Sequence, residues 1–375
     1  MLRWCVVLAV ALAGAQQTAD HDWQIGPFTR PVTGNPVIAP NAASVFDDPI
    51  RGGPVHWESL HTFNPAAIVR NGRIDVLYRA EDNTGEMQIG MHTSRLGLAE
   101  SEDGIHFTRR ATPVFYPAKD SQEAREWPGG VEDPRIVEAE DGTYVLTYTQ
   151  WNRKTYSVGI ATSRDLEHWT KHGPAFFEAK GGKYADLKYK SAGIVTTLRS
   201  GKLVAARIHG QYWMYWGEGA IHLATSQDLV HWTPTEDEHG EPMEVLRPRA
   251  GHFDSSFPEV GPPPVLTKRG IVVIYNGKNA ATGGDPELAP STYAAGEALF
   301  DAGHPARLLA QTEHPVLKPE LPYERTGQYA AGTTFAEGLV YFHDRWFLYY
   351  GCADSLVSVA TASGNVTNSV PISGQ

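Results

Sequence analysis

The chain has 375 residues, with 32 Lys and Arg against 43 Asp and Glu, and its formal net charge is -11 at pH 7. This negative charge disfavours nucleic acid and anionic membrane surfaces as partners. The only two cysteines, Cys5 and Cys352, are too few for a CxxC-type zinc site. The aromatic residues, among them ten Trp and sixteen Tyr, suit both sheet packing and stacking on sugar rings.

The N-terminus has the pattern of a secretory signal peptide. Arg3 supplies the positive region, an apolar run extends from Trp4 to Ala13, and small residues at 13–15 form a cleavage site. The run is too short to cross a bilayer, and no later segment has eighteen unbroken apolar residues. We therefore expect a signal peptide at 1–15, a single domain at 16–375 and a periplasmic or secreted protein with no membrane partner. Its oligomeric state stays open.

Strand patterns recur along the remainder of the chain. Runs rich in β-branched and aromatic residues predict strands at 73–80, 143–151, 202–210, 271–277 and 345–351. Each follows a turn residue, and these turn residues are Gly72, Gly142, Gly201, Gly270 and Asp344. Their intervals of 70, 59, 69 and 74 residues indicate five repeated units, and no long segment has a helical period.

A second motif follows the first three of these strands. It is SEDGIHFTR at 101–109, SRDLEHWTK at 163–171 and SQDLVHWTP at 226–234. Each unit therefore predicts a four-stranded antiparallel blade, and the five units predict an all-β, five-bladed β-propeller. Because His106, His168 and His231 recur at equivalent outer positions, they are assigned to turns and blade packing rather than to metal binding or catalysis.

The fifth unit ends early, because only a polar tail follows SLVSVATA at 355–362. The N-terminal segment PFTRPVTGNPVIAP (27–40) is similar to HFTRRATPVFYPA (106–118), which belongs to the outer part of the first unit. We therefore expect an N-terminal strand to complete the last blade and close the ring, which would also cover an exposed sheet edge.

Polar residues recur at the start of each predicted inner strand, so the blade pattern places them at one end of the propeller axis. They are Asn64, Asp133, Lys190 and Glu259. The loops that return to the same end carry Arg79, Asp82, Trp151, Glu218, Asn276 and Asp354. Such a mixture of charged, amide and aromatic side chains indicates a pocket for a polyhydroxylated ligand.

The motif WPGGVEDPRI (127–136) contains two adjacent acids. Strict strand alternation would send Glu132 and Asp133 to opposite faces, with Arg135 on the face of Asp133. On this pattern only Asp133 would face the ligand. Glu132 has either a surface role or a binding role.

The ordered set FNPA, LYRAED, GGVEDPRI, KSAGI, YWGEG, FPEVGPP with IYNG, and YYGCADS resembles glycoside hydrolase family 130, a family of five-bladed mannoside-active enzymes. The resemblance covers almost the whole mature chain. That family contains phosphorylases of β-mannosides and hydrolases of β-1,2-linked mannosides. In the phosphorylases basic residues hold phosphate, whereas in the β-1,2-mannosidases two glutamates occupy that region, and here Glu218 and Glu259 match them.

The resemblance also implies roles for single residues. Asp133 would be the acid, with its proton relayed through a sugar hydroxyl, and Glu218 and Glu259 would orient and deprotonate water in an inverting reaction. The residues that match mannose-binding positions, or that the blade pattern adds to the pocket, are Asn64, Arg79, Arg95, Lys190, Asn276, Tyr293 and Asp354. Tyr293 ends an inserted loop that either caps the pocket or is a plain surface loop.

The expected function is an exported, inverting β-1,2-mannosidase that releases mannose from mannose-containing oligosaccharides, without a cofactor or metal. Two ionised glutamates would repel a phosphate dianion by several kcal/mol at roughly 4 Å if the effective dielectric constant is about 20. Two alternatives stay open. One is a β-mannoside phosphorylase that releases mannose 1-phosphate, and the other is a sugar-binding propeller without activity.

Overall fold

The computed structural model describes residues 22–364, so the predicted signal peptide lies outside the described residues. Within this range the chain is almost entirely strands and turns. The helical segments are single turns, namely α2 (Glu123–Glu126), η1 (Ala179–Gly182) and η2 (Pro322–Glu324). The all-β class predicted from the sequence is confirmed. Within residues 22–364, no helix combines the length and the apolar character needed to cross a membrane.

Strands pair mainly with their neighbours in the chain, in antiparallel groups. A short hairpin of β1 (Phe46–Asp48) and β2 (Gly53–Val55) precedes these groups. The first two groups consist of β3 (His61–Arg70), β4 (Arg73–Glu81), β5 (Ser94–Ser101) and β6 (Thr108–Arg109), and of β7 (Gly130–Glu138), β8 (Tyr144–Trp151), β9 (Tyr156–Ser163) and β10 (Trp169–Pro174).

In the central part of the chain the strands are shorter and more often interrupted. It contains β11 (Ala192–Ile194), β12 (Thr196–Arg199), β13 (Lys202–Ala205), β14 (Arg207–Ile208), β15 (Gln211–Trp216), β16 (Ile221–Ser226), β17 (Trp232–Pro234) and β18 (Glu244–Leu246). The strand predicted at 202–210 is split here, because β13 pairs with β12 whereas β14 pairs with β15. The chain therefore changes sheets in the middle of the predicted strand.

Two further groups complete the described chain. They are β19 (Phe257–Val260), β20 (Val265–Thr267), β21 (Gly270–Lys278), β22 (Tyr293–Phe300) and β23 (Leu308–Gln311), followed by β24 (Thr334–Phe342), β25 (Arg345–Cys352) and β26 (Leu356–Ser363). The strands predicted at 271–277 and 345–351 agree with β21 and β25 to within one residue at each end.

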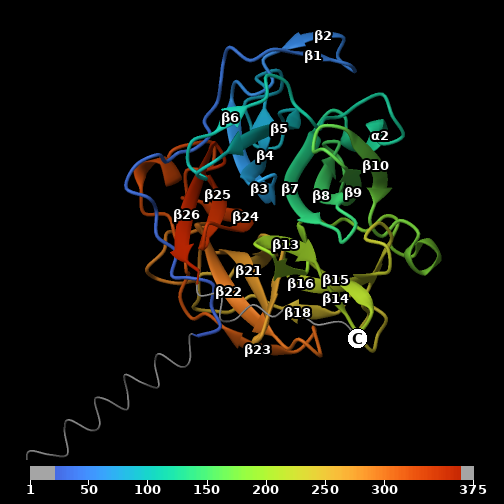
Figure 1. Cartoon of the computed structure of the whole chain (residues 1–375), viewed down its shortest axis with the longest axis vertical. Helices are drawn as coiled ribbons and strands as arrows, with labels where there is room; N and C mark the ends of the chain where they lie inside the picture. Colours follow the sequence, from blue (N-terminus) through green and yellow to red (C-terminus); the bar gives the residue numbers. More distant parts are fainter. Residues whose placement is uncertain (1–21, 365–375) are drawn as a thin grey trace, which may run out of the picture.

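Figure 1 shows the groups arranged around a common centre, with β3, β7 and β24 close to it. Short parallel pairings connect neighbouring groups, for example Ser94 of β5 with Gly130 of β7. The described strands form open sheets of 15, 6, 3 and 2 strands, and none of these sheets closes on itself. The five-bladed closed ring therefore stays a prediction, whereas the central meeting of inner strands is observed.

The segment after residue 28 lies against the last strand. Thr29 and Ile38 form antiparallel bridges with Thr361 and Val357 of β26. The side chain of Asn35 adds two hydrogen bonds, because its Nδ2 donates to the Val359 carbonyl at 2.8 Å and its Oδ1 accepts from the Val359 amide at 2.9 Å. These contacts cover the backbone edge of β26 that would otherwise face water.

The hydrophobic core lies between successive groups rather than at one place. One cluster joins the first and second groups and includes Leu77, Leu98, Leu146 and Ala161. A similar cluster joins the last two groups with the N-terminal segment, and others lie between the remaining neighbours. Because each group is fixed by apolar packing on both sides, the polar ends of the inner strands are held at the centre.

The histidine motifs form surface turns, as the sequence predicts. In the second of them Asp165 accepts hydrogen bonds from the backbone amides of Glu167 and His168, and its other oxygen lies 2.8 Å from His168 Nδ1. The His168 side chain is 87% exposed. The same Asp and His pairing recurs in the other two motifs, so these histidines serve the turns.

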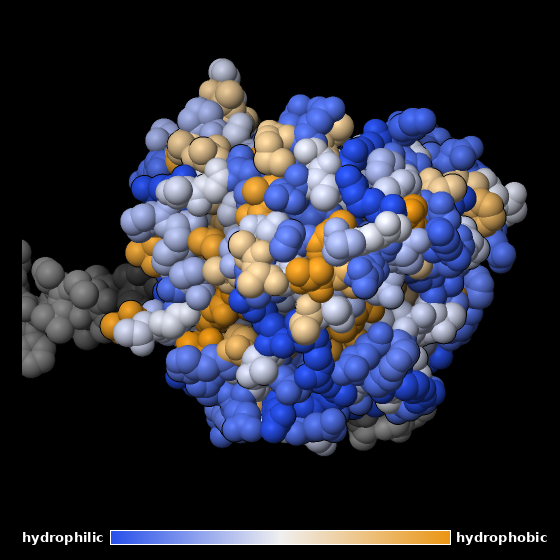
Figure 2. Space-filling model, turned by 90° about the horizontal axis from the view of Figure 1, so that it is seen from above, coloured by the Kyte–Doolittle hydropathy of each residue, from blue (hydrophilic) through white to orange (hydrophobic). Residues whose placement is uncertain are grey.

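The surface seen in Figure 2 is mostly polar, with apolar residues in small separate patches. Among the described residues, large exposed apolar side chains include Val32, Met87 and Ile89. Ile89 is the functionally interesting one, since it also lines the central cavity described below.

Candidate active site

A cavity of about 310 Å³ lies at the centre, where the inner strands and their loops meet. Its polar lining comes from Asn64, Arg79, Glu132, Asp133, Thr149, Lys190, Glu218, Glu259, Gln328 and Asp354. Its aromatic lining comes from Phe63, Trp151, Tyr156, Tyr293, Tyr329 and Phe335. A cavity with many hydrogen-bonding groups and several aromatic faces is suited to a sugar.

Nine of the twelve predicted pocket residues line this cavity. They are Asn64, Arg79, Asp133, Trp151, Lys190, Glu218, Glu259, Tyr293 and Asp354. Asp82, Arg95 and Asn276 are not among the lining residues, and Asp82 instead pairs with Arg95. The structure therefore brings together residues that are up to 290 positions apart in the sequence.

A break in the register of β7 turns both acids of the VEDPR motif into the cavity. Pairing with β8 shifts between Glu132 and Arg135, and Asp133 has a positive φ of 48°. A bulge of this kind interrupts the alternation of side chains. The expectation that Glu132 and Asp133 point to opposite faces is therefore wrong, because the extra residue aims both carboxylates at one guanidinium.

The same device occurs in two other inner strands. The pairing of β3 shifts around Asn64, which has a φ of 46°, and the pairing of β24 shifts around Glu337. Asn64 Nδ2 donates a hydrogen bond of 2.8 Å to Asp133 Oδ1. The bulges thus direct side chains toward the centre, where regular strands would direct every second residue elsewhere.

Arg79 on β4 contacts most of the charged side chains on one side of the cavity. Its Nη1 lies 3.0 Å from Asp133 Oδ1, and its Nη2 lies 2.7 Å from Glu81 Oε1 and 2.9 Å from Glu132 Oε1. Its Nε donates to Ser94 Oγ at 3.0 Å. One cation therefore holds three carboxylates in fixed positions, which is the role that the planar guanidinium performs best.

The two adjacent acids differ in proton affinity. Burial raises the pKa of Glu132, and although Arg79 opposes this, repulsion by Asp133 and Glu81 helps to bring the pKa to about 7. Burial also acts to raise the pKa of Asp133, but the charges of Arg79 and Lys190 outweigh it and lower the pKa to about 2. At neutral pH the proton of this pair therefore resides mainly on Glu132.

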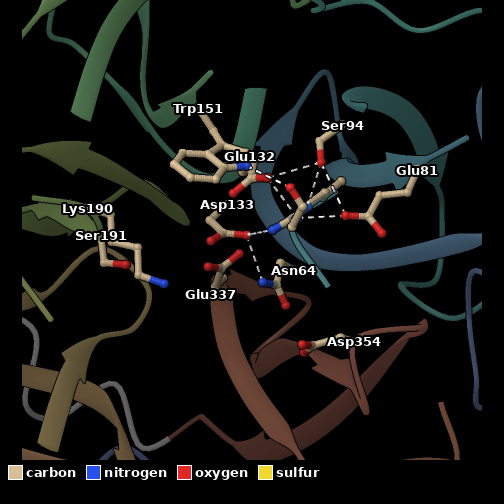
Figure 3. Close-up of polar contacts among 12 residues, drawn as sticks. Asn64, Glu81, Ser94, Glu132, Asp133, Trp151, Lys190, Ser191, Glu337 and Asp354 are labelled. Carbon is tan, nitrogen blue, oxygen red and sulfur yellow. Dashed lines mark hydrogen bonds and ion pairs between the residues drawn. The ribbon is translucent and has the colours of Figure 1, made fainter. Parts of the chain in front are cut away.

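Figure 3 shows Lys190 and Ser191 on the side of the site opposite Ser94 and Glu81. These two residues hold a second pair of acids, Glu218 and Glu259. Lys190 Nζ lies 3.5 Å from Glu218 Oε2 and 3.6 Å from Glu259 Oε1. Ser191 Oγ donates to Glu259 Oε1 at 2.5 Å. Glu218 and Glu259 are also paired as an antiparallel bridge, so the two glutamates are neighbours in space.

Glu259 has the features of a general base. Its side chain is buried, and its Oε2 has no hydrogen-bond partner. Burial raises the pKa of Glu259, and with repulsion from Glu218 opposing the attraction of Lys190 the pKa is about 7. A carboxylate that titrates near neutrality and keeps one free oxygen can accept a proton from water.

A buried ion pair between Arg135 and Glu337 holds inner strands together next to the cavity. Arg135 Nη1 lies 2.9 Å from Glu337 Oε1, and the guanidinium also donates to the carbonyls of Asp133, Val260 and Gly261. Arg135 thereby connects β7, β19 and β24 at the level of the site. Glu337 was missed from the sequence, although TFAEGLV (334–340) repeats the opening of TFNPAAIV (62–69).

Arg95 and Asn276 are structural in this fold, which contradicts their predicted placement in the sugar site. Arg95 is fully buried, and its two terminal nitrogens lie 2.6 Å from Asp82 Oδ2 and 2.5 Å from Asp48 Oδ2. Asn276 Nδ2 donates to the carbonyl of Ala336, and its Oδ1 accepts from the Ala336 amide. Both side chains use their polar groups to hold the strands and loops around the site.

Replacing Arg95 by Met should therefore reduce stability and leave sugar affinity unchanged. The substitution leaves Asp48 and Asp82 buried without their cation, which costs about 3–5 kcal/mol when one partner of a buried pair is removed. Chemical denaturation measures this loss, and calorimetric titration of the folded variant with mannobiose measures affinity. A variant that is as stable as the parent but binds sugar more weakly would restore Arg95 to the site.

Aromatic residues frame the open part of the cavity, and sequence reasoning identified only some of them. Tyr293, at the start of β22, makes edge contacts with Tyr329 and Phe335 at centroid distances of 5.4 and 5.6 Å. On the other side Trp151 contacts Tyr156 at 6.3 Å. These rings lie on loops and strand ends, where a single sequence gives little indication of which aromatic residues face inward.

Comparison with known proteins is consistent with this site. Residues 35–370 match the model of the family Glyco_hydro_130, described as β-1,4-mannooligosaccharide phosphorylase. A 1,2-β-oligomannan phosphorylase from Thermoanaerobacter sp. is 32% identical over 307 residues, which are 81% of this chain and 90% of the relative.

Solved structures of higher identity also match. A glycosyl hydrolase from Bacteroides ovatus is 51% identical, with a TM-score of 0.89 over 91% of this chain and 94% of that chain. Another structure, 52% identical with the same TM-score and coverage, comes with the statement that the GH130 family of mannoside phosphorylases contains glycoside hydrolases that target β-1,2 mannosidic linkages in Candida mannan. With a family match over residues 35–370 and these relatives, the chain belongs to glycoside hydrolase family 130.

Proposed function

We propose that this protein is an exported β-1,2-mannosidase, which hydrolyses β-1,2-linked mannosides with inversion and releases mannose. The observation that carries the proposal is the state of the cations in the cavity. Both lining cations are already committed, Arg79 to three carboxylates and Lys190 to Glu218 and Glu259. A phosphate dianion needs free cations, whereas a water molecule needs only a base and a hydrogen-bond partner.

The comparisons support the hydrolytic form in one respect. The solved structures at 51 and 52% identity are described with the words glycosyl hydrolase and glycoside hydrolases, whereas the phosphorylase from Thermoanaerobacter is 32% identical. These descriptions belong to those proteins. They favour a hydrolase here because the chain is more similar to them than to the phosphorylase. The negative charges of Glu218 and Glu259, which would repel phosphate, favour a hydrolase as well.

In the proposed reaction the two sides of the cavity perform separate tasks. Asp133 protonates the departing oxygen through a sugar hydroxyl, and Glu132 is the adjacent group that carries a proton at neutral pH. On the opposite side Glu259 accepts a proton from water, and Glu218, which is 30% exposed, helps to orient that water. An inverting glycosidase needs this division between an acid and a distant base.

The remaining polar residues bind the sugar in this proposal. Asn64, Arg79 and Asp354 hold the mannose to be cleaved, while Lys190 and Tyr293 contact it from the other side. The scaffold is proposed to be a five-bladed propeller closed by the N-terminal segment, for which the bridges from Thr29 and Ile38 to β26 are the support. Export is proposed from the sequence pattern at 1–15 alone.

The products distinguish the two family activities. With β-1,2-mannobiose in phosphate-free buffer, we expect mannose as the product, formed first as the α-anomer because an inverting attack reverses a β linkage. Proton NMR during the first minutes measures the anomer, and β-1,4-mannobiose is the matched substrate that should react slowly. Release of mannose 1-phosphate only when phosphate is added would favour the phosphorylase, and binding without any product would favour a sugar-binding propeller.

A further inference from the structure

A group of three potential metal ligands lies beside the sugar cavity, behind Arg79. His61 and Glu81 are directly paired across β3 and β4, and His92 comes from the loop before β5. One ligand atom from each side chain lies within 4.8 Å of the other two. Glu81 is fully buried, His92 is 2% exposed and His61 is partly buried.

The hydrogen bonds of this group leave one ring nitrogen free on each histidine. The His61 ring is held through Nδ1, which lies 2.9 Å from Ser355 Oγ, so Nε2 is left for another partner. The buried Nδ1 of His92 has no hydrogen-bond partner. A buried polar nitrogen without a partner is unusual and indicates a place for a bound water or ion.

The two carboxylate oxygens of Glu81 have different partners. Its Oε1 receives the Arg79 guanidinium at 2.7 Å and Ser94, whereas its Oε2 has one hydrogen bond, from Gln328 Nε2 at 3.2 Å. Gln328 Oε1 is itself buried without a partner. A carboxylate can therefore keep Arg79 on one oxygen and coordinate a cation with the other.

The charge around Arg79 also favours a cation at this place. One guanidinium contacts Glu81, Glu132 and Asp133, and with the proton of the adjacent acids on Glu132 the cluster has one more negative charge than positive ones. In a buried environment such an excess is unfavourable unless further positive charge is near. A divalent ion on Oε2 of Glu81, the oxygen that does not contact Arg79, would supply it without displacing Arg79.

We propose that His61, Glu81 and His92 bind a zinc-type divalent ion, with water or Gln328 Oε1 in the fourth position. Two imidazoles and one carboxylate suit zinc, whereas calcium and magnesium prefer all-oxygen sites. Ligands around tetrahedral zinc at about 2.1 Å are roughly 3.4 Å apart, so ligand atoms that now lie within 4.8 Å of one another need to approach by up to about 1.4 Å.

The ion acts on the site through Glu81. Because Glu81 holds Arg79, and Arg79 holds Asp133 and Glu132, a fixed Glu81 fixes the acid side of the cavity. This is the relation between a metal and the groups bonded to its ligands. The metal performs no step of the sugar chemistry, and the inference is independent of whether the reaction is hydrolysis or phosphorolysis.

Zinc alone, added to chelator-treated full-length protein near neutral pH, tests the proposal. Isothermal titration should give one equivalent per chain, and His61→Gln and His92→Gln should each weaken binding at least 30-fold. Cobalt substitution should give the visible absorption of a tetrahedral site in the parent only. His106→Ala is the matched control, since His106 is an exposed histidine that also contacts a carboxylate, and it should bind zinc like the parent.

The outcomes separate a metal site from two packed histidines, whose rings lie 6.0 Å apart at 62°. Failure of the parent to bind one equivalent, or binding that survives both glutamine substitutions, would overturn the proposal. If a variant does not fold, which circular dichroism shows, the cobalt spectrum of the parent still decides whether imidazole nitrogens coordinate the ion. None of these measurements uses substrate, so their failure is distinct from failure of the proposed hydrolase activity.

Discussion

Replacing Glu259 by Gln should lower kcat on β-1,2-mannobiose by about 10²–10⁴-fold, the range that a general base contributes. The amide has the shape of the carboxyl group and can still accept the hydrogen bond from Ser191, so the fold and sugar binding should persist. Because the pKa of Glu259 is about 7, kcat/KM of the parent should fall as the pH drops below about 7. Steady-state kinetics across pH measure both effects.

Two further variants make this result specific. Glu218→Gln removes the neighbouring carboxylate and should also slow turnover, whereas Glu238→Gln changes a glutamate whose side chain is 87% exposed and should have no effect. The hydrolase assignment also predicts the response to phosphate. If Glu259→Gln raised phosphate-dependent turnover, the glutamate would be acting only as a barrier to phosphate, and the proposed base would be wrong.

The sequence was sufficient to predict that the starts of four inner strands meet at the centre, because the repeat gives the position of each of these strands. Asn64, Asp133, Lys190 and Glu259 come from four successive units and all line one cavity. This convergence depends only on strand order and direction. The prediction therefore holds for these four residues even though the central strands pair irregularly.

The direction of individual side chains was harder to predict, because a bulge of one residue changes the face of the strand to which the following side chains point. Glu132 is the clearest case, since regular alternation would turn it away from Asp133. Arg79 and Arg95 show the opposite problem. Arg79 is paired with Leu96 and Arg95 with Ala80, so the two arginines occupy neighbouring rows of the same pair of strands. The rows face different ways, and only Arg79 lines the cavity.

Asn276 shows a third reason why the sequence alone does not reveal the role of a single side chain. It is directly paired with Glu259 across β19 and β21, so the register places it beside a candidate catalytic residue. Both polar groups of its side chain are nevertheless bonded to the backbone of Ala336. Whether a polar side chain serves a ligand or a neighbouring strand depends on backbone groups from another unit, which the local sequence does not reveal.

Replacing Asp133 by Asn should lower kcat on β-1,2-mannobiose by about 10²–10⁴-fold through loss of the acid. The amide oxygen can still accept from Asn64 and Arg79, so the arrangement of the cavity should be retained. An aryl β-mannoside with an acidic phenol as leaving group needs little protonation, and the variant should hydrolyse it much more nearly at the parental rate. Equal losses on both substrates would mean that Asp133 binds the sugar and does not supply a proton.

The variant Glu132→Gln tests whether Glu132 holds the proton that Asp133 passes to the departing oxygen. In the free site the pKa of Glu132 is about 7 and that of Asp133 is about 2, so the aspartate alone is a poor proton donor at neutral pH. If Glu132 supplies the proton that Asp133 passes on, the glutamine variant should lose about 10²-fold on mannobiose. It should also lose the decline in kcat/KM above about pH 7, while remaining active on the aryl substrate. If the decline persists unchanged, bound sugar must raise the pKa of Asp133 itself, and Glu132 then serves only to hold Arg79.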